Sequence, residues 1–130
     1  MNDIQLLKEK VKDLKVLFVD DEKDVRRGTG MFLQKFFDNV VVCSDGQEGL
    51  KAFLKDKDFD VVITDILMPI MDGVQMTKEI RKINSEVFVI FLTASRSVSE
   101  LDKNLSDITL QKPLSFDDIV KVMQKLQDIT

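Results

Sequence analysis

The sequence contains no histidine, tryptophan or tyrosine, and it has one cysteine among its 130 residues. Without histidine, the chain cannot use an imidazole for general acid–base catalysis, build the usual zinc sites or carry a phosphohistidine. A single cysteine cannot form an internal disulfide, and this is typical of a cytoplasmic protein. The longest apolar run, Val87 to Leu92, is far too short to cross a bilayer. We therefore expect a cytoplasmic protein without a membrane partner.

The chain also lacks a cluster of basic residues. It has 19 basic and 23 acidic side chains, which give a net charge of −4. Because nucleic-acid backbones select dense lysine and arginine, this balance argues against nucleic acid as the main partner. The composition, 44% hydrophobic and 32% charged, is that of an ordinary globular protein, and the length is that of one domain.

Short β-branched runs alternate with helical patterns along the chain. Five runs predict strands: Lys15–Val19, Asn39–Cys43, Asp60–Thr64, Val87–Leu92 and Ile108–Gln111. The middle runs are apolar without a two-residue alternation, as in parallel strands that are covered on both faces. Apolar residues at helical spacing between the strands predict buried helix faces that include Leu54, Ile83 and Phe116. The pattern predicts an α/β fold with a doubly wound, five-stranded parallel sheet and helices on both faces.

The two ends of the chain carry further helical signals. Residues 1–14 place apolar side chains at heptad-like spacing, but two heptads are too few for a coiled coil. We therefore predict an N-terminal helical extension over 1–14 that lies on a domain formed by 15–130. Near the other end, Ser115 followed by Asp118 predicts a capping box for the last helix.

Polar residues follow four of the predicted strands. Asp20 and Asp21 follow the first strand, Asp65 the third, Thr93 the fourth and Lys112 the fifth. Singly, each has an ordinary explanation, such as a helix cap for Asp20 or a surface charge for Lys112. Together they are expected to meet, because the carboxyl ends of parallel strands share the edge where doubly wound sheets bind ligands.

Three carboxylates at one sheet edge repel one another unless a cation lies among them. An all-oxygen set of ligands suits Mg²⁺, whose coordination a substrate phosphate often completes. A lysine and a hydroxyl opposite the carboxylates suit the equatorial oxygens of a phosphoryl group. The residues therefore predict Mg²⁺-dependent phosphoryl transfer onto a carboxylate, with an aspartyl phosphate as product.

Four motifs in order resemble the receiver domain of two-component response regulators. They are VLFVDDE (Val16–Glu22), VVITDILMPIMDG (Val61–Gly73), FLTAS (Phe91–Ser95) and LQKP (Leu110–Pro113). The resemblance implies a flavodoxin-like strand order of 2-1-3-4-5. It also implies a sensor histidine kinase or phosphotransfer protein as phosphoryl donor, and a downstream partner or effector domain. Enzyme activity would be limited to the domain's own phosphorylation and dephosphorylation.

The resemblance also implies roles for single residues. Asp65 would be the phosphoacceptor, and Mg²⁺ would be held by Asp20, Asp21, Asp65 and the backbone carbonyl of Leu67.

On the phosphoryl side, the resemblance implies that Thr93 donates a hydrogen bond to the phosphoryl group and that Lys112 forms a salt bridge with it. The peptide bond before Pro113 would be cis.

At Thr109, the family usually has an aromatic residue that swings inward as Thr93 moves, so the sequence departs from the pattern there. We therefore expect the switch to act through the segment Ser95–Ser106, which has few apolar residues and would open at low cost.

Two other classes of protein stay open as alternatives. A pseudo-receiver would have the same fold but would act as a protein-docking module without phosphorylation. The complete set of acidic-site residues disfavours this alternative, and the missing aromatic residue at Thr109 keeps it open. A phosphatase of the haloacid dehalogenase type also forms an aspartyl phosphate. Such a phosphatase has a second aspartate two residues after the nucleophile. This chain has Leu67 at that position, which argues against the phosphatase.

Overall fold

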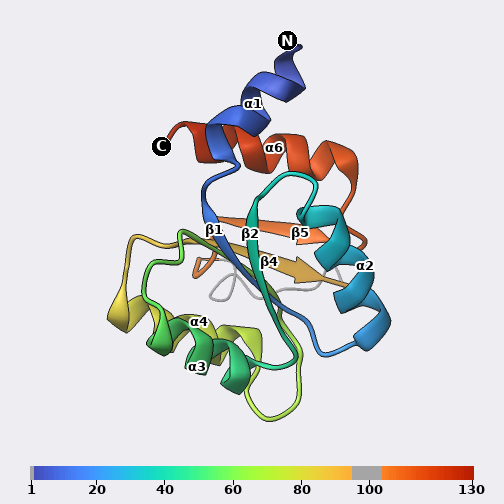
Figure 1. Cartoon of the computed structure of the whole chain (residues 1–130). Coiled ribbons are helices and arrows are strands. Elements are labelled where there is room, and N and C mark those ends of the chain that lie inside the picture. The colour runs from blue at the N-terminus through green and yellow to red at the C-terminus, as the bar shows by residue number, and fades with distance from the viewer. Residues whose placement is uncertain (1, 95–103) are drawn as a thin grey trace.

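One parallel sheet with the strand order β2-β1-β3-β4-β5 forms the centre of the computed structural model, which describes residues 2–94 and 104–130 (Figure 1). The strands are β1 (Lys15–Val19), β2 (Asn39–Cys43), β3 (Val61–Asp65), β4 (Phe88–Thr93) and β5 (Ile108–Gln111). Every neighbouring pair of strands is parallel, which confirms the predicted sheet and its strand order. β3 and β4 lie one residue later than predicted, so Asp65 and Thr93 are the last residues of their strands.

The helices of the described residues cover both faces of the sheet. They are α1 (Asp3–Val11), α2 (Lys23–Leu33), α3 (Gly46–Lys55), α4 (Gly73–Ile83) and α6 (Phe116–Gln127). Figure 1 shows α1, α2 and α6 on one side of the sheet and α3 and α4 on the other. Most of the segment Ser95–Ser106, the expected switch, lies outside the described residues.

Consecutive residues of β1 show how the strands bury both faces. Val16 and Phe18 belong to the core cluster on the side of α2 and α6, whereas Leu17 and Val19 belong to the cluster on the side of α3 and α4. All four side chains have no exposed surface. Each such burial contributes about 1.5–3 kcal/mol, and the absence of a polar face explains why the strand sequences do not alternate.

Three residues expected on buried helix faces are exposed instead, so that part of the prediction is wrong. Leu54 is 49% exposed, Ile83 is 37% exposed and Phe116 is 51% exposed. Each lies in the first or last turn of its helix, where fewer neighbours are available to cover a side chain.

Helices lie near both ends of the chain. α1 packs on α6, and its residues Leu7 and Val11 join the core cluster there. The capping box of α6 is confirmed: the amide of Asp118 donates to Ser115 Oγ and the amide of Ser115 donates to Asp118 Oδ2, both at 3.0 Å. None of the helices in the described ranges has the length and apolar character that crossing a bilayer requires.

Two helical glycines with opposite surroundings give a test of this packing. A Cβ at Gly28 in α2 would meet nothing within 4 Å, so we expect Gly28→Ala to raise the free energy of unfolding by about 1 kcal/mol. A Cβ at Gly49 in α3 would lie 2.7 Å from Met76 Sδ and 2.9 Å from Val19 Cγ2, so Gly49→Ala is expected to destabilise the domain. Urea denaturation followed by circular dichroism measures both changes. A loss of stability in Gly28→Ala would contradict this description of α2.

Candidate functional site

Three carboxylates lie together at the carboxyl edge of the sheet. β1 and β3 are neighbours in register, and Val19 pairs with Thr64, so Asp20 and Asp65 follow on adjacent strands. Asp20, Asp21 and Asp65 each offer one carboxylate oxygen, and these oxygens all lie within 4.8 Å of one another. Asp20 is fully buried, Asp65 is half-buried and Asp21 is exposed, so the cluster is open to solvent on one side.

Lys112, directly after β5, reaches into this cluster. Its Nζ donates to Asp20 Oδ2 at 2.7 Å and to Asp65 Oδ2 at 3.0 Å. Its backbone amide donates to the carbonyl oxygen of Thr93 at 2.8 Å, so the end of β4 holds the lysine in place. Thr93 is half-buried and pairs with Gln111 of β5. The sheet thus gathers residues that lie 92 positions apart in the chain at one point.

The loop after β3 is held tightly against the strand end. The amide of Gly73 donates to the carbonyl oxygen of Ile66 at 2.8 Å. A Cβ at Gly73 would lie 2.1 Å from the carbonyl oxygen of Asp65, so no larger residue fits this close approach. Leu67 lies in this loop with its side chain 79% exposed. On the other side of the site, the peptide bond between Lys112 and Pro113 is cis.

The same loop contains a strained turn. Ile70 has a φ of 72°, and the amide of Met71 donates to the carbonyl oxygen of Pro69 at 2.8 Å. This is a γ-turn with positive φ, a rare conformation that is costly for a β-branched residue. The turn directs the carbonyl oxygen of Met71 to the amide of Gly46 at 3.1 Å, which ties the loop to the start of α3.

Thr109 makes a local contact in β5. It pairs with Phe91 of β4 and is half-buried. Its Oγ1 lies 2.8 Å from Ser106 Oγ, within hydrogen-bond distance. A pair of hydroxyl groups therefore lies at the position where the resemblance implies an aromatic ring in other receiver domains.

The charges of the site do not balance. Burial raises the pKa of Asp65, and Asp20 adds to this effect, while Lys112 and the amide of Ile66 act in the opposite direction. Burial disfavours the charged form of Lys112, but its hydrogen bonds to Asp20 and Asp65 outweigh burial and raise the pKa of its ammonium. Three carboxylates face one ammonium group, so a further cation would relieve the repulsion.

The donor set fits a hard divalent cation. The three side-chain candidates are carboxylates, of which one is buried, one half-buried and one exposed, so that an ion could bind and keep part of its water shell. These are the properties that Mg²⁺ prefers. Asp20 Oδ1 is already oriented by the amide of Glu22 at 2.9 Å. Because Glu22 is the N-cap of α2, the explanation of Asp20 as a helix cap is wrong.

Arg26 is a residue of the site that the sequence did not single out. Its Nη1 donates to the backbone carbonyl oxygen of Asp20 at 2.9 Å and thereby braces the strand end from α2. Its partner is a backbone group, and nothing in the pattern of α2 separates this arginine from the neighbouring Lys23 and Arg27.

The comparisons with known proteins agree with this geometry. The family model of the response regulator receiver domain matches residues 16–124, so the chain belongs to the receiver domains of two-component response regulators. The chain is 32% identical over 113 residues to the transcriptional regulatory protein RprY of Bacteroides fragilis, covering 82% of this chain and 46% of that protein. It is 31% identical over 117 residues to the response regulator MprA of Mycolicibacterium vanbaalenii, covering 87% of this chain and 50% of that protein.

Solved structures place the fold in the same family. The response regulator TrrA of Thermotoga maritima, in complex with Mg²⁺-BeF, has a TM-score of 0.78 and 32% identity, covering 87% of this chain and 98% of that one. A receiver domain protein of Clostridium thermocellum has a TM-score of 0.75 and 30% identity, covering 88% and 94% of the two chains. The chain spans about half the length of the curated relatives it matches.

The pKa of Asp65 gives a prediction for the metal-free domain. Because its pKa is raised on folding, the charged carboxylate lowers the stability of the folded state at neutral pH. We therefore expect Asp65→Asn to raise the melting temperature by a few degrees in the presence of a chelator. As the pH falls through the raised pKa of Asp65, the wild type becomes protonated and the difference between the two proteins shrinks. Thermal melts between neutral pH and pH 4 measure this, and a less stable Asn variant at neutral pH would contradict it.

Proposed function

We propose that this receiver domain accepts a phosphoryl group onto Asp65 in a Mg²⁺-dependent reaction and changes conformation to pass on a signal. The observation that carries the proposal is the contact of Lys112 with both Asp20 and Asp65, beside the exposed Asp21. This arrangement combines a nucleophile, a set of cation ligands and a positive charge that can follow the transferred group.

In the proposed reaction, a carboxylate oxygen of Asp65 attacks the phosphorus atom. The new oxygen–phosphorus bond forms as the bond between phosphorus and the donor breaks, and a phosphohistidine donor would release its imidazole. Mg²⁺, held by Asp20, Asp21, Asp65 and the backbone carbonyl of Leu67, would neutralise negative charge on the phosphoryl oxygens.

Two residues would then hold the phosphoryl group. The ammonium of Lys112, now shared by Asp20 and Asp65, would pair with one phosphoryl oxygen, and the hydroxyl of Thr93 would donate to another. Since the backbone amide of Lys112 is hydrogen-bonded to the carbonyl oxygen of Thr93, a movement of either residue would displace the ends of both β4 and β5.

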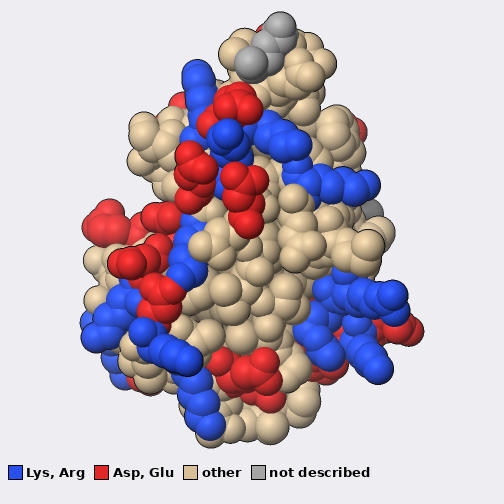
Figure 2. Space-filling view, in the orientation of Figure 1, with Lys and Arg blue, Asp and Glu red and all other residues tan. Residues whose placement is uncertain are grey.

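The proposed phosphoryl donor is a histidine kinase or a phosphotransfer protein, because the chain has no histidine of its own. Figure 2 shows basic side chains gathered over α2. A hollow of about 310 Å³ on this helix is lined by Lys23, Arg26, Arg27, Gly30, Met31, Gln34 and Val42. Arg26 links this surface to the site by its hydrogen bond to the backbone carbonyl oxygen of Asp20. The surface is therefore a candidate contact for the phosphoryl-donor protein. The relatives are about twice as long, which supports output through a further domain or a partner.

A docking module without phosphorylation is the weaker proposal. It draws support from Thr109, which is too small to act as the moving aromatic ring. However, such a module has no use for a half-buried lysine paired with the buried Asp20, since an unneeded charge pair at a buried site is costly to retain.

The phosphoacceptor can be tested by a single substitution. Asp65→Asn removes the nucleophilic oxygen charge, so incubation with acetyl phosphate and Mg²⁺ is expected to add one phosphoryl mass to the wild type and none to the variant. Intact-protein mass spectrometry measures the mass change. Asp38→Asn, at an exposed aspartate between α2 and β2, is the matched control and should be phosphorylated like the wild type. Phosphorylation of the Asp65 variant would show that another residue is the acceptor.

The metal site can be tested by its effect on stability. Binding to the folded state alone adds about 2.7 kcal/mol when Mg²⁺ is present at roughly 100 times its Kd. We expect Asp21→Ala to lose most of this gain, because Asp21 is the solvent-exposed ligand of the cluster and contributes nothing to the core. Thermal melts with and without Mg²⁺ give the shift for each protein. An Asp21 variant that responds to Mg²⁺ like the wild type would place the metal elsewhere.

A further inference from the structure

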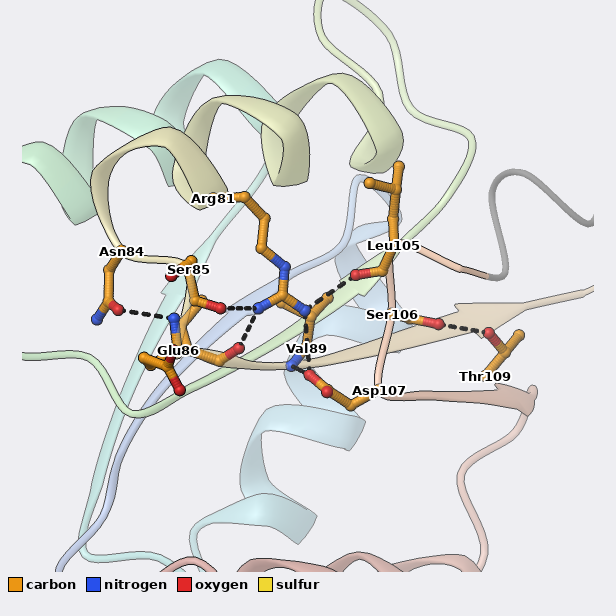
Figure 3. Close-up of polar contacts among 10 residues, drawn as sticks. Arg81, Asn84, Ser85, Glu86, Val89, Leu105, Ser106, Asp107 and Thr109 are labelled. Atoms are coloured by element: carbon orange, nitrogen blue, oxygen red, sulfur yellow. Dashed lines mark hydrogen bonds and ion pairs between the residues drawn. The ribbon is translucent and has the colours of Figure 1, made fainter.

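An arginine in the last turn of α4 ties three segments together at the edge of the sheet opposite the acidic site. Arg81 Nη1 donates to the carbonyl oxygens of Ser85 at 2.9 Å and Val87 at 2.6 Å, just before β4. Its Nη2 donates to the carbonyl oxygen of Leu105 at 3.0 Å and to Asp107 Oδ2 at 3.1 Å, just before β5. Figure 3 shows the guanidinium lying between these acceptors. The planar fork of arginine can serve all of them at once, whereas a lysine cannot.

Asp107 makes the first contact between β4 and β5. Its backbone amide donates to the carbonyl oxygen of Val89 at 2.8 Å. Its Oδ2, the atom that Arg81 also contacts, accepts from the amide of Val89 at 2.8 Å (Figure 3). The side-chain carboxylate thus takes the place that a backbone carbonyl has in a continuous ladder. We call Arg81 and Asp107 the β5 clamp.

Within the described part of the chain, the side chains of β5 are half-buried or exposed, so polar contacts help to fix its register. It is a strand of four residues at the edge of the sheet, and it pairs with β4 alone. Ile108, Thr109 and Leu110 are only half-buried, and Gln111 is exposed. The register of a strand is strongly specified where one of its faces is fully buried and weakly specified elsewhere. Much of the register of β5 therefore depends on the polar contacts of the clamp.

The register of β5 decides where Lys112 lies. A slip by one residue moves a strand by about 3.3 Å and turns each side chain to the opposite face. Lys112 Nζ lies 2.7 Å from Asp20 Oδ2 and 3.0 Å from Asp65 Oδ2, and such a slip would break both contacts.

We propose that Arg81 and Asp107 are positioning residues for the acidic site, which act through β5 to hold Lys112 against Asp20 and Asp65. Lys112 follows Asp107 by five positions, so the clamp acts over about 16 Å of strand. Neither clamp residue touches the phosphoryl group. The kinetic consequence of this inference rests on the proposed function, whereas the placement of Lys112 can be measured without it.

Arg81→Met in the full chain tests the clamp, with Lys82→Met as matched control. Lys82 is the next residue of α4, it is 71% exposed and it pairs only with Glu79 among the described ion pairs. We expect Arg81→Met to lower the rate of phosphorylation by acetyl phosphate and Mg²⁺ at least about tenfold, because the lysine is misplaced. The Kd for Mg²⁺, measured by titration calorimetry, should stay the same or tighten, since the ligands lie on β1 and β3 and lose a competing ammonium. Lys82→Met should change neither quantity.

A lower phosphorylation rate with an unchanged or tighter Kd for Mg²⁺ would indicate that Arg81 positions Lys112. A general loss of structural order would instead lower the rate and weaken Mg²⁺ binding together. Wild-type phosphorylation rates in Arg81→Met and in the more conservative Arg81→Lys would overturn the proposal, as would an equal loss in Lys82→Met. Arg81→Lys also serves as the test if Arg81→Met does not fold.

A nuclear magnetic resonance readout is independent of phosphorylation. A hydrogen-bonded, shielded ammonium exchanges its protons slowly, so the wild type should give a ¹H–¹⁵N signal for Lys112 Nζ, assigned by its loss in Lys112→Met. We expect this signal to disappear in Arg81→Met and Asp107→Ala and to persist in Lys82→Met. Its persistence in both clamp variants would refute the inference. If the wild type is not phosphorylated at all, the proposed function fails, and this signal alone decides whether the clamp exists.

A double substitution tests whether Arg81 acts on the site through Lys112. In the Lys112→Met background there is no ammonium left to position, so adding Arg81→Met should leave the Kd for Mg²⁺ unchanged. A further change of that Kd would show that Arg81 acts on the carboxylates by another route, and it would contradict the proposal.

Discussion

The ion pair of Lys112 with Asp20 and Asp65 is the contact on which the rest of the site depends. It joins the ends of β1, β3 and β5 at distances of 2.7 and 3.0 Å, with Asp20 fully buried. Three carboxylates this close are unfavourable without positive charge, and the ammonium supplies part of it. The remaining imbalance is what makes the edge of the sheet receptive to a further cation. A lysine in this position stabilises the carboxylate cluster and would compete with a cation for the same oxygens.

Contacts at both edges of the sheet hold Lys112, Asp20 and Asp65 together. At the carboxyl edge, Gly73 allows the loop after β3 to approach Asp65, and Arg26 braces the backbone of Asp20 from α2. At the opposite edge, Arg81 and Asp107 hold the beginnings of β4 and β5. The buried residues of β1 and β3 make the centre rigid, whereas β5 is short and half-buried. The strand that carries the lysine is therefore the one that most needs polar contacts to keep its register.

The parts of the molecule that the sequence predicted are those with a strong periodic or positional signal. The central strands β1, β3 and β4 are buried on both faces and have apolar sequences. The parallel topology brings the residues after the strands together, so Asp20, Asp65 and Lys112 could be grouped from the sequence alone. Arg26, Arg81 and Asp107 could not, because they bind backbone groups of distant segments and resemble ordinary surface charges in the sequence.

Other details depend on tertiary context in the same way. Leu54, Ile83 and Phe116 match helical spacing but lie in terminal turns, where spacing does not guarantee burial. The positive φ of Ile70 is imposed by the loop that surrounds it, and no propensity of isoleucine points to it.

The most direct measurement of the central claim is a crystal structure of the domain with Mg²⁺ and beryllofluoride, a mimic of the bound phosphoryl group. We expect beryllium on a carboxylate oxygen of Asp65, the metal ligated by Asp20, Asp21 and Asp65, and Lys112 moved from Asp20 to a fluoride. Beryllofluoride on another residue, or Lys112 still bonded to Asp20 with the metal outside the cluster, would contradict it.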